Sequence, residues 1–400
     1  MAEIAKKHKY ILITNGESYV GRTMAIHIAD ELEHREGKLK KSHWRVRVLC
    51  ENKHKMDYLE KRGIDVKEVD YESEHMLREQ MKDHIKIMIF NPFCTKDGRM
   101  AMYGKNLIDA AMHEKVKRAI MISSFGCEMA EDNESPMGQF KQAENHFRKC
   151  FEYGYWLIFR IPFIQQYMYF WKSMIENKSR LGMPMSKHSL LTMVNIKDVL
   201  ECVSIACLSK KSAVWSAYAN SGNESDNSSS DDLIKLNKPS SKQLQTGGSH
   251  STGMKKLFML HSMQPMSLKM IAESLMKALK HDDSGLDIDT IEMEYHELES
   301  YLKYIAENMD HCSTNPSSFD LASKHKSNHE DHLAWHPMPK EDLKHFQIKL
   351  IIDHFKMAHC SDVVAPLNND VRDILGRDPI ELRDFFMLNR RQFRPTAKKQ

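Results

Sequence analysis

The sequence predicts an α/β protein built on one doubly wound parallel sheet, with a smaller α/β lobe toward the C-terminus. Two observations lead to this fold class. From the N-terminus to about residue 160, apolar runs typical of buried strands alternate with segments whose apolar residues recur at helical spacing. The first apolar run also enters its helix through a short turn that contains two glycines. Strands that read as nearly continuous apolar runs indicate a sheet covered by helices on both faces.

Each element is predicted from its own segment. In the segment 103–114, for example, Leu107, Ala110 and Ala111 share one helical face, which is expected to pack on the sheet. Strands are expected at 10–13, 44–49, 66–69, 85–90, 116–123, 156–161, 214–219 and 257–260. Helices are expected from about 20 to 32 and at 53–62, 74–81, 103–114, 139–153 and 196–208.

The turn after the first strand indicates a Rossmann-type unit. In dinucleotide-binding units, early glycines let the backbone approach a pyrophosphate, and a last glycine lets the helix pack on the strand. Here Asn15 and Ser18 stand at the first two places and only Gly21 remains, although asparagine still tolerates a positive φ. The turn therefore predicts the fold more firmly than the ligand, and loss of the ligand stays as an alternative. The candidate dinucleotide contacts here are Asn15, Gly16, Ser18, Tyr19, Val20 and Gly21.

The composition is that of a large soluble protein. Its 400 residues are 41% hydrophobic and 28% charged, which allows an extensive core. No apolar run reaches the ~18 residues that a membrane span needs, and no signal-peptide segment is expected. The eight cysteines show no paired framework, which favours reduced thiols in the cytoplasm or nucleus. A net charge of +3 does not indicate nucleic-acid binding.

Four segments carry a resemblance to a known family. They are residues 104–111, 116–126 and 156–163, together with a tail at 369–385 that has an Asp-Val, Gly-Arg-x-Pro and Phe pattern. In them the chain resembles the NmrA-like branch of the atypical short-chain dehydrogenases/reductases, over most of its length apart from two insertions. The resemblance implies a bound nicotinamide dinucleotide. It also implies that the protein acts as a redox sensor or regulator through a protein partner, as many members of the branch do.

The two insertions differ from the rest in composition. Residues 220–253 are rich in Ser, Asn, Asp and Gly and predict a disordered surface loop. Residues 308–340 hold a set of possible zinc ligands, but a solvated surface is the preferred interpretation and no metal is predicted. That set is His311, Cys312, His325, His329, His332 and His336. The expected division is a dinucleotide-binding core at 1–162, 189–219 and 254–262, and a smaller lobe at 163–188 and 263–400.

Catalysis would depend on a proton donor beside the nicotinamide. In reductases of the wider family, a Tyr and a Lys four residues later share one helix face, and the lysine lowers the pKa of the phenol. Here Lys141 is present, but Met137 replaces the Tyr, and a thioether cannot donate a proton. Ser124, or its neighbour Ser123, would be the serine partner. A non-catalytic sensor is therefore favoured over an NAD(P)-dependent oxidoreductase of small carbonyl or quinone substrates that relies on Lys141.

The end of the second strand bears on the choice of cofactor. Glu51 stands where many family members carry Arg, and a carboxylate there binds ribose hydroxyls and repels a 2′-phosphate. NAD is therefore favoured over NADP, although Lys53 and Lys55 could reach a phosphate. The remaining cofactor contacts that the resemblance implies are Asp70 and Tyr71 at the adenine, Asn91, Pro92 and Phe93 beneath the nicotinamide, Lys141, and Phe163.

Overall fold

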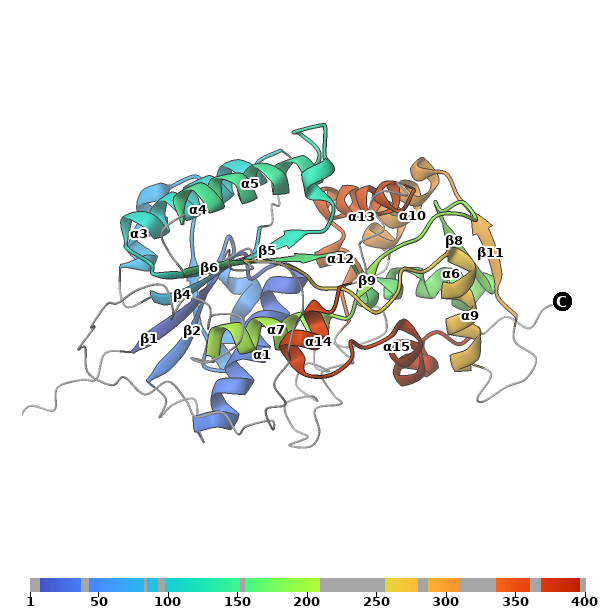
Figure 1. Ribbon diagram of the computed structural model, residues 1–400, viewed down its shortest axis with the longest axis horizontal. Coiled ribbons are helices and arrows are strands. Elements are labelled where there is room, and N and C mark those ends of the chain that lie inside the picture. Colours follow the sequence, from blue (N-terminus) through green and yellow to red (C-terminus); the bar gives the residue numbers. More distant parts are fainter. Residues whose placement is uncertain are drawn as a thin grey trace, which may run out of the picture.

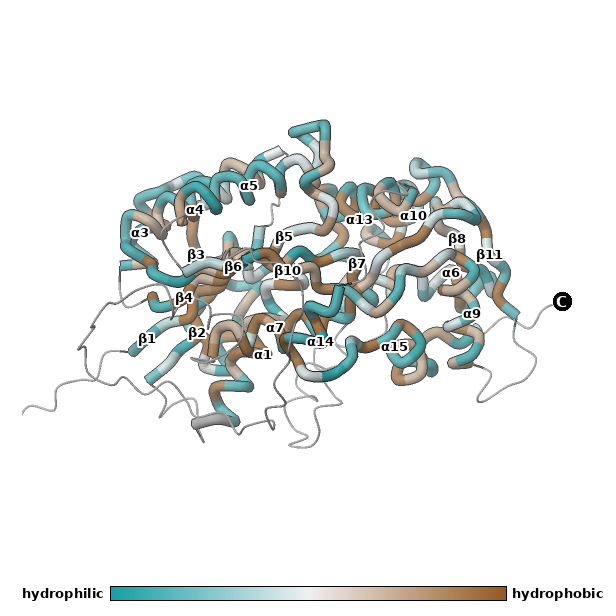
Figure 2. The backbone as a smooth tube through the Cα atoms, viewed as in Figure 1, coloured by the Kyte–Doolittle hydropathy of each residue, from teal (hydrophilic) through white to brown (hydrophobic). Residues whose placement is uncertain are grey.

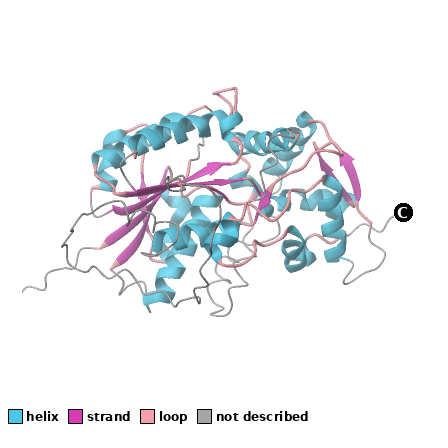
Figure 3. Cartoon of the chain, viewed as in Figure 1, coloured by secondary structure: helices cyan, strands magenta, loops and turns pink. Residues whose placement is uncertain are grey.

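The computed structural model describes residues 8–36, 43–82, 85–92, 98–151, 155–208, 256–279, 287–308, 336–359 and 368–395. At its centre is a seven-stranded parallel sheet with helices on both faces (Figures 1 and 3). This arrangement confirms the predicted α/β, doubly wound fold class. A second group of helices and short strands lies beyond one end of the sheet (Figure 1).

The order of the strands reverses at the middle of the sheet. The strands are β1 (Lys9–Ile13), β2 (Trp44–Cys50), β3 (Asp65–Glu68), β4 (Ile85–Phe90), β5 (Arg118–Ser124), β6 (Tyr155–Ile161) and β10 (Leu257–Met259). Their order is β10-β6-β5-β4-β1-β2-β3, and every neighbouring pair is parallel. The chain thus builds outward from β1 to β3 and then crosses to β4 and continues in the other direction. Ligands of such sheets bind where the direction changes.

Some of the helices cover the sheet in two layers, and others lie beyond its end. They are α1 (Tyr19–Glu36), α2 (Asp57–Lys61), α3 (Glu74–Met81), α4 (Met100–His113), α5 (Pro136–Cys150), α6 (Lys172–Lys178), α7 (Ile196–Leu208), α9 (Leu268–Leu279), α10 (Tyr295–Asn308), α12 (Pro339–Asp342), α13 (His345–Ala358), α14 (Asp370–Leu375) and α15 (Leu382–Asn389). Helices α3, α4 and α5 lie on one face of the sheet, and α1 and α7 on the other (Figure 1). None of these described helices is long and apolar enough to cross a bilayer.

Most predicted helices are present, with shifts at their ends, whereas in the one expected at 53–62 only Asp57–Lys61 is α-helical, after a 3₁₀ helix at Lys53–Met56. Those expected at 74–81 and 196–208 have these bounds, whereas those expected at 103–114 and 139–153 begin earlier, at Met100 and Pro136. The early start of α5 follows from its cap. Ser135 Oγ accepts the Gly138 N–H, and Pro136 occupies the first helical turn, where its missing N–H costs nothing.

Strand β1 shows how the sheet is buried on both sides. Ile11 and Ile13 belong to the hydrophobic core that includes residues of α1 and α7, while Leu12 between them belongs to the core on the opposite face. Successive side chains of a strand point to opposite faces, so a strand covered on both sides must be apolar throughout. Figure 2 shows the apolar residues gathered along the central strands, with hydrophilic residues on the outer sides of the helices.

Most of the described residues after β6, other than those of α7 and β10, build a lobe beyond the carboxyl ends of the strands. In it, β7 (Phe163–Ile164) pairs with β9 (Met193–Val194), and β8 (Arg180–Met183) pairs with β11 (Asp289–Glu292). Helices α6, α9, α10, α13 and α15 surround these short strands (Figure 1). The ring of Tyr169 stacks on that of Phe393, with 5.0 Å between centroids. Aromatic contacts therefore join the middle of the chain to its C-terminal part.

Several predicted features lie outside the described residues. They are the strand at 214–219, the loop at 220–253, residues 309–335 of the His-rich segment, and Phe93.

His336, the one histidine of the His-rich set that lies among the described residues, is partly buried instead of fully solvated. The ring of His336 meets Tyr169 edge-on, with 3.9 Å between centroids, and its Nε2 lies 3.0 Å from Gln392 Nε2. Burial lowers the pKa of His336 to about 4. His336 is therefore packed into the aromatic part of the lobe, because Tyr169 offers an apolar partner for a neutral imidazole.

Candidate functional site

A cavity lies at the carboxyl ends of β1, β4, β5 and β6, between the sheet and α13. Its free volume is about 50 Å³ when counted as positions open to the centre of a water molecule, and about 520 Å³ when all non-atom space and the open solvent at its mouth are included. Of the residues that the sequence predicts, the structure brings together here Ser18, Tyr19, Val20, Asn91, Pro92, Ser123 and Ser124. From the lobe, the wall is formed by Tyr167, Phe346, Gln347, Leu350 and His354. This is the position at which α/β sheets of this order bind ligands.

The glycine turn is held together by its own side chains. Asn15 adopts the positive φ that the sequence allows, 53°, and its Nδ2 donates to the Asn91 carbonyl oxygen at 2.7 Å. Ser18 Oγ accepts the Gly21 N–H at 3.0 Å and Asn91 Nδ2 at 2.7 Å. The turn is thus tied to β4 from within, and a phosphate oxygen would have to displace the Ser18 hydroxyl to reach the Gly21 amide.

Gly21 and the start of α1 shape the rest of the turn. A Cβ at Gly21 would overlap the Asn15 carbonyl oxygen and come within 2.9 Å of Ser18 Oγ. Tyr19 and Val20, the first residues of α1, line the cavity, so the N-terminus of this long helix opens into it. Helix N-termini carry a partial positive charge and favour anions. The helix end is the feature of the turn that suits a pyrophosphate.

Glu17 lies in the glycine turn, beside the cavity without lining it, as Glu51 does after β2, and the sequence did not single Glu17 out. Its Oε1 accepts the backbone N–H of Glu51 at the end of β2. Its Oε2 is buried and has no hydrogen-bond partner among the described residues. Burial, and more weakly the Glu51 carboxylate, raise the pKa of Glu17 to about 7. The turn thus sends a second carboxyl group to the strand end that binds the adenosine ribose in Rossmann-type folds.

The two lysines that follow Glu51 are engaged by carboxylates. Lys53 Nζ lies 2.9 Å from Glu60 Oε1, and Lys55 Nζ lies 3.5 Å from Glu341 Oε2. Neither lysine lines the cavity. A 2′-phosphate at this strand end would therefore meet carboxyl groups before it met a cation.

Three other predicted contacts lie away from the cavity. Asp70 is exposed and accepts the Glu72 N–H at 2.9 Å within a turn. Tyr71 is buried, and its hydroxyl accepts the Asn15 N–H at 3.0 Å, so it supports the turn from behind. Phe163 is buried in the lobe against Phe355. None of these three residues lines the cavity, and of them only Tyr71 supports the glycine turn.

Strand β5 ends in two serines that line the cavity. Ser123 Oγ lies 3.7 Å from Cys127 Sγ. Ser124 Oγ is buried and has no hydrogen-bond partner among the described residues. A buried hydroxyl without a partner costs free energy, and a bound polar group or water would remove that cost. The Ser124 hydroxyl is therefore suited to contact a polar part of a ligand.

Neither Met137 nor Lys141, which stand on α5 at the positions of the Tyr and Lys of related reductases, lines the cavity. Met137 is buried in the core, and Lys141 Nζ donates to the Ala130 carbonyl oxygen at 2.8 Å. The two residues are four apart and share one face of the helix, so both miss the cavity together. Phe140 is the residue of α5 that lines it. The wall contributed by α5 is an aromatic ring that cannot donate a proton.

A buried ion pair holds α5 against the sheet. Arg160 of β6 donates from Nε and Nη2 to the two carboxylate oxygens of Glu144, each at 2.8 Å. Burial by itself would raise the pKa of Glu144, but the hydrogen bonds and charge of Arg160 lower it overall. Because both groups are buried, this bidentate contact restricts how α5 can turn about its axis.

A second buried ion pair joins the glycine turn to the lobe. Arg22 donates from Nη1 to Asp342 Oδ1 at 2.6 Å and from Nη2 to Oδ2. Only 1% of the Arg22 side chain and 2% of the Asp342 side chain are exposed. Asp342 ends α12, directly before the helix that walls the cavity. The sequence shows Arg22 in the first turn of a predicted helix, but nothing local identifies a partner 320 residues away.

The lobe side of the cavity is neutral at pH 7. Burial lowers the pKa of His354 to about 4, so its imidazole carries no charge. Burial also raises the pKa of Tyr167, whose hydroxyl oxygen accepts Gln347 Nε2 at 3.3 Å. Together with Phe346 and Leu350, these side chains form a wall suited to a planar, uncharged group.

Comparison with known proteins bears on what the cavity holds. Residues 34–153 match a protein-family model described as NAD(P)H-binding. The matched part runs from the end of α1 to just after α5, which is less than a third of the chain and does not include the glycine turn. None of the curated proteins matches the sequence significantly.

Solved structures share the fold at low sequence identity. Triphenylmethane reductase of Citrobacter sp., complexed with NADP(H), is 11% identical, with a TM-score of 0.56 over 94% of this chain and 98% of that one. NADPH-dependent quinone oxidoreductase of Escherichia coli, complexed with NADPH, is 12% identical, with a TM-score of 0.56 over 94% and 97%. A nucleoside-diphosphate-sugar epimerase of Staphylococcus aureus is 15% identical, with a TM-score of 0.55 over 95% and 99%. The chain therefore contains a segment that matches an NAD(P)H-binding family model, within a fold that it shares with reductases and an epimerase.

Proposed function

We propose that this protein is an NmrA-like regulator that binds NAD(H) in the cavity and signals its presence to a protein partner without catalytic turnover. The orientation of α5 carries the proposal. Met137 replaces the phenol, Lys141 is bonded to a backbone carbonyl outside the cavity, and Phe140 faces the ligand space. A positioned acid is worth about 10² to 10⁴ in rate for such transfers, so its absence favours binding over catalysis.

The residues of the cavity fit a dinucleotide in part. The N-terminus of α1 suits the pyrophosphate, and the unpartnered Ser124 hydroxyl suits a polar group on the nicotinamide half. Phe140 and Leu350 would exclude water from that half. A bound nicotinamide supplies hydride chemistry, and the chain's own side chains here bind and orient it.

NAD is the preferred form on electrostatic grounds. Glu17 and Glu51 both lie at the end of β2, and the two lysines nearby are engaged by Glu60 and Glu341. An added 2′-phosphate would be repelled by the Glu51 carboxylate, and above pH 7 also by Glu17, while both nearby lysines are already paired.

The lobe offers a route from ligand to partner. Helix α13 walls the cavity and is joined through Asp342 to Arg22, which directly follows the glycine turn. A ligand that contacts both the turn and α13 would favour one position of the lobe relative to the sheet. The five free cysteines of the described residues agree with a reducing compartment, cytoplasm or nucleus.

An oxidoreductase is the second candidate function. Ser124, Tyr167 and His354 line the cavity, and two proteins of the same fold are a triphenylmethane reductase and a quinone oxidoreductase. However, the pKa of His354 lies far below 7 and that of Tyr167 is raised, so neither suits proton donation at neutral pH.

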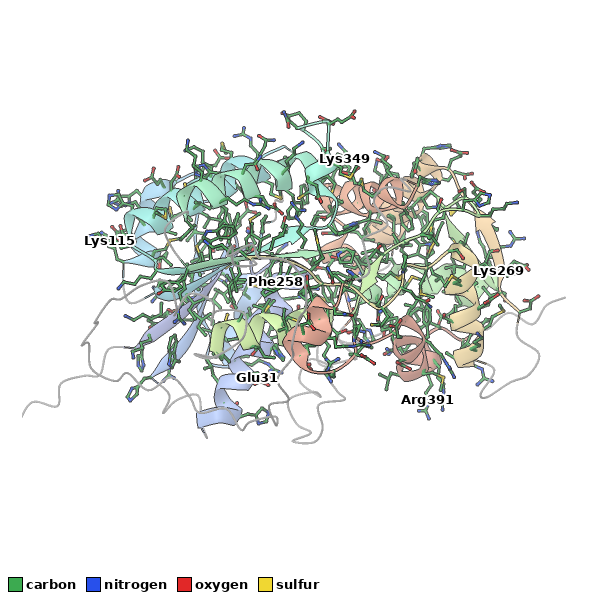
Figure 4. All side chains as sticks on the ribbon, viewed as in Figure 1. Glu31, Lys115, Phe258, Lys269, Lys349 and Arg391 are labelled. Carbon is green, nitrogen blue, oxygen red and sulfur yellow. The ribbon has the colours of Figure 1, made fainter. Side chains whose placement is uncertain are left out.

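Calorimetric titration of the full chain with NAD, NADH, NADP and NADPH tests the binding. We expect NAD or NADH to bind with at least tenfold preference over the phosphorylated forms. Leu350→Trp should fill the cavity and abolish binding, whereas Lys349→Trp should not, because Lys349 lies on the outer side of the same helix (Figure 4). If none of the four dinucleotides binds, the proposal fails.

Turnover separates the two candidates. NADH and NADPH consumption across quinones, aldehydes and ketones should stay near background. Robust consumption by the wild-type chain that disappears in Lys141→Ala would establish the lysine-assisted oxidoreductase instead.

A further inference from the structure

A group of three metal-ligating side chains lies on the outer layer of helices, away from the cavity. Asp109 comes from α4, and His146 and Cys150 come from α5 at a spacing of four residues. The two helices run side by side over the same face of the sheet (Figure 1). Among the described residues, this is the group in which His, Cys and acidic ligands converge.

The three ligand atoms already lie close together. His146 Nε2 is 2.7 Å from Asp109 Oδ1, Cys150 Sγ is 3.4 Å from His146 Nε2, and Cys150 Sγ is 4.0 Å from Asp109 Oδ1. Zinc–ligand bonds of about 2.0 to 2.3 Å at tetrahedral angles separate the ligand atoms by roughly 3.3 to 3.6 Å. Shifts of about half an ångström would therefore bring the three atoms to that spacing, which rotation of the side chains can supply.

The surroundings suit a metal at this place. Lys105 Nζ bonds the other carboxylate oxygen, Asp109 Oδ2, at 2.6 Å, which orients the carboxylate and leaves Oδ1 directed at His146. The buried contact of Glu144 with Arg160, on the same helix, fixes the position of α5. The side chains of His146 and Asp109 are 26% and 30% exposed, so an ion could enter from solvent and keep a water as its fourth ligand.

We propose that Asp109, His146 and Cys150 form a zinc site that clamps α4 to α5. One thiolate, one imidazole and one carboxylate are the donor types that Zn²⁺ accepts in a tetrahedral site. On binding, the thiol proton of Cys150 is released to solvent, and the proton on His146 Nε2 transfers through solvent to Nδ1, so that the ring stays neutral and Nε2 is free to bind the metal. The hydrogen bond between His146 and Asp109 is thereby replaced by two metal bonds. The site needs no dinucleotide and is independent of the proposed regulation.

Cobalt(II) is the probe for this site, because a Co²⁺–thiolate bond gives a charge-transfer band in the near ultraviolet. The full reduced chain, stripped of metal, should bind one Co²⁺ with this band, and one equivalent of Zn²⁺ should remove it. Cys150→Ser should abolish the band, and His146→Ala and Asp109→Asn should weaken cobalt binding at least tenfold.

The matched control is Cys312→Ser, because the His-rich segment around Cys312 is the rival zinc-binding sequence. A band that survives Cys312→Ser and disappears in Cys150→Ser supports the proposal. A band that disappears in Cys312→Ser, or no band at all in a chain whose circular dichroism is native, overturns it. His113→Ala, which removes an exposed histidine of α4, should leave the cobalt affinity unchanged.

Discussion

Among single residues, Glu17 makes the stability of the folded protein depend on pH. Its carboxyl is placed by the glycine turn against the Glu51 amide, and burial raises its pKa from 4.5 to about 7. The folded state therefore holds a proton on Glu17 that the unfolded state loses between these pH values. As the pH rises from about 4.5 to 7, the ionised form becomes a cost to folding, which reaches about 3 kcal/mol above pH 7.

We expect Glu17→Gln to stabilise the protein by about 3 kcal/mol at pH 8 and to have almost no effect at pH 4.5. The amide oxygen of Gln can still accept the Glu51 N–H, and its neutral side chain removes the cost of burying a charge. Urea denaturation at the two pH values measures the difference. His354 and the other groups whose pKa values are shifted titrate in the same way in both proteins, so their contributions cancel in the difference between the two free energies of unfolding. An equal effect at both pH values would mean that the carboxyl of Glu17 is not protonated in the folded state.

At the scale of elements, the approach of α1 to β1 depends on Gly21. The Cβ of any other residue would overlap the Asn15 carbonyl oxygen, which is part of the turn's own backbone and cannot move aside alone. We expect Gly21→Ala to destabilise the fold by about 3 kcal/mol.

Gly376→Ala is the control for Gly21→Ala. Gly376 ends α14 with φ of 71° and has nothing within 4 Å of its missing Cβ, so only the backbone penalty of about 1 kcal/mol applies. Thermal unfolding of both variants makes the comparison. A smaller loss for Gly21→Ala than for Gly376→Ala would show that α1 does not depend on this close approach.

At the scale of the whole molecule, the pair of Arg22 and Asp342 joins the first helix to the C-terminal lobe. Removal of one partner leaves the other charge buried without compensation, which typically costs about 3 to 5 kcal/mol. We therefore expect Asp342→Ala to destabilise the protein by this amount in urea denaturation.

Two further variants test that interpretation. Glu341→Ala removes a neighbouring carboxylate whose contact with Lys55 is exposed, so its cost should stay below about 1 kcal/mol. The double variant Arg22→Met/Asp342→Leu should lose less than Asp342→Ala alone, because no charge remains buried. If Asp342→Ala and Glu341→Ala cost the same, the ion pair does not hold the lobe.

Much of the sheet could be predicted because its signals are local. Continuous apolar runs such as 85–90, helical spacing such as that of Leu107, Ala110 and Ala111, and the glycine turn each depend on residues close together in sequence. The positive φ of Asn15 could be predicted for the same reason, because the backbone preference of asparagine is a property of that residue alone.

Residues of the candidate site could be predicted from the sequence only where they lie at the end of a strand. Ser18 follows strand β1, Asn91 follows β4, and Ser124 is the last residue of β5. Parallel strands bring their carboxyl ends to one edge of the sheet, so the meeting of these residues in the cavity follows from the fold class. The fold class does not determine which side of α5 faces the cavity. A helix can turn about its axis, and the contact between Glu144 and Arg160 selects Phe140 rather than Lys141 as the lining residue.

The sequence by itself determined the α/β class, most elements of the sheet and the strand ends at which the cavity lies, because these depend on spacing within short segments. Only the tertiary structure decided that α13 forms the far wall, that Arg22 pairs with Asp342 and that Glu17 reaches the end of β2. Such contacts join residues as far as 320 positions apart, and their free energy depends on burial, which no local pattern records.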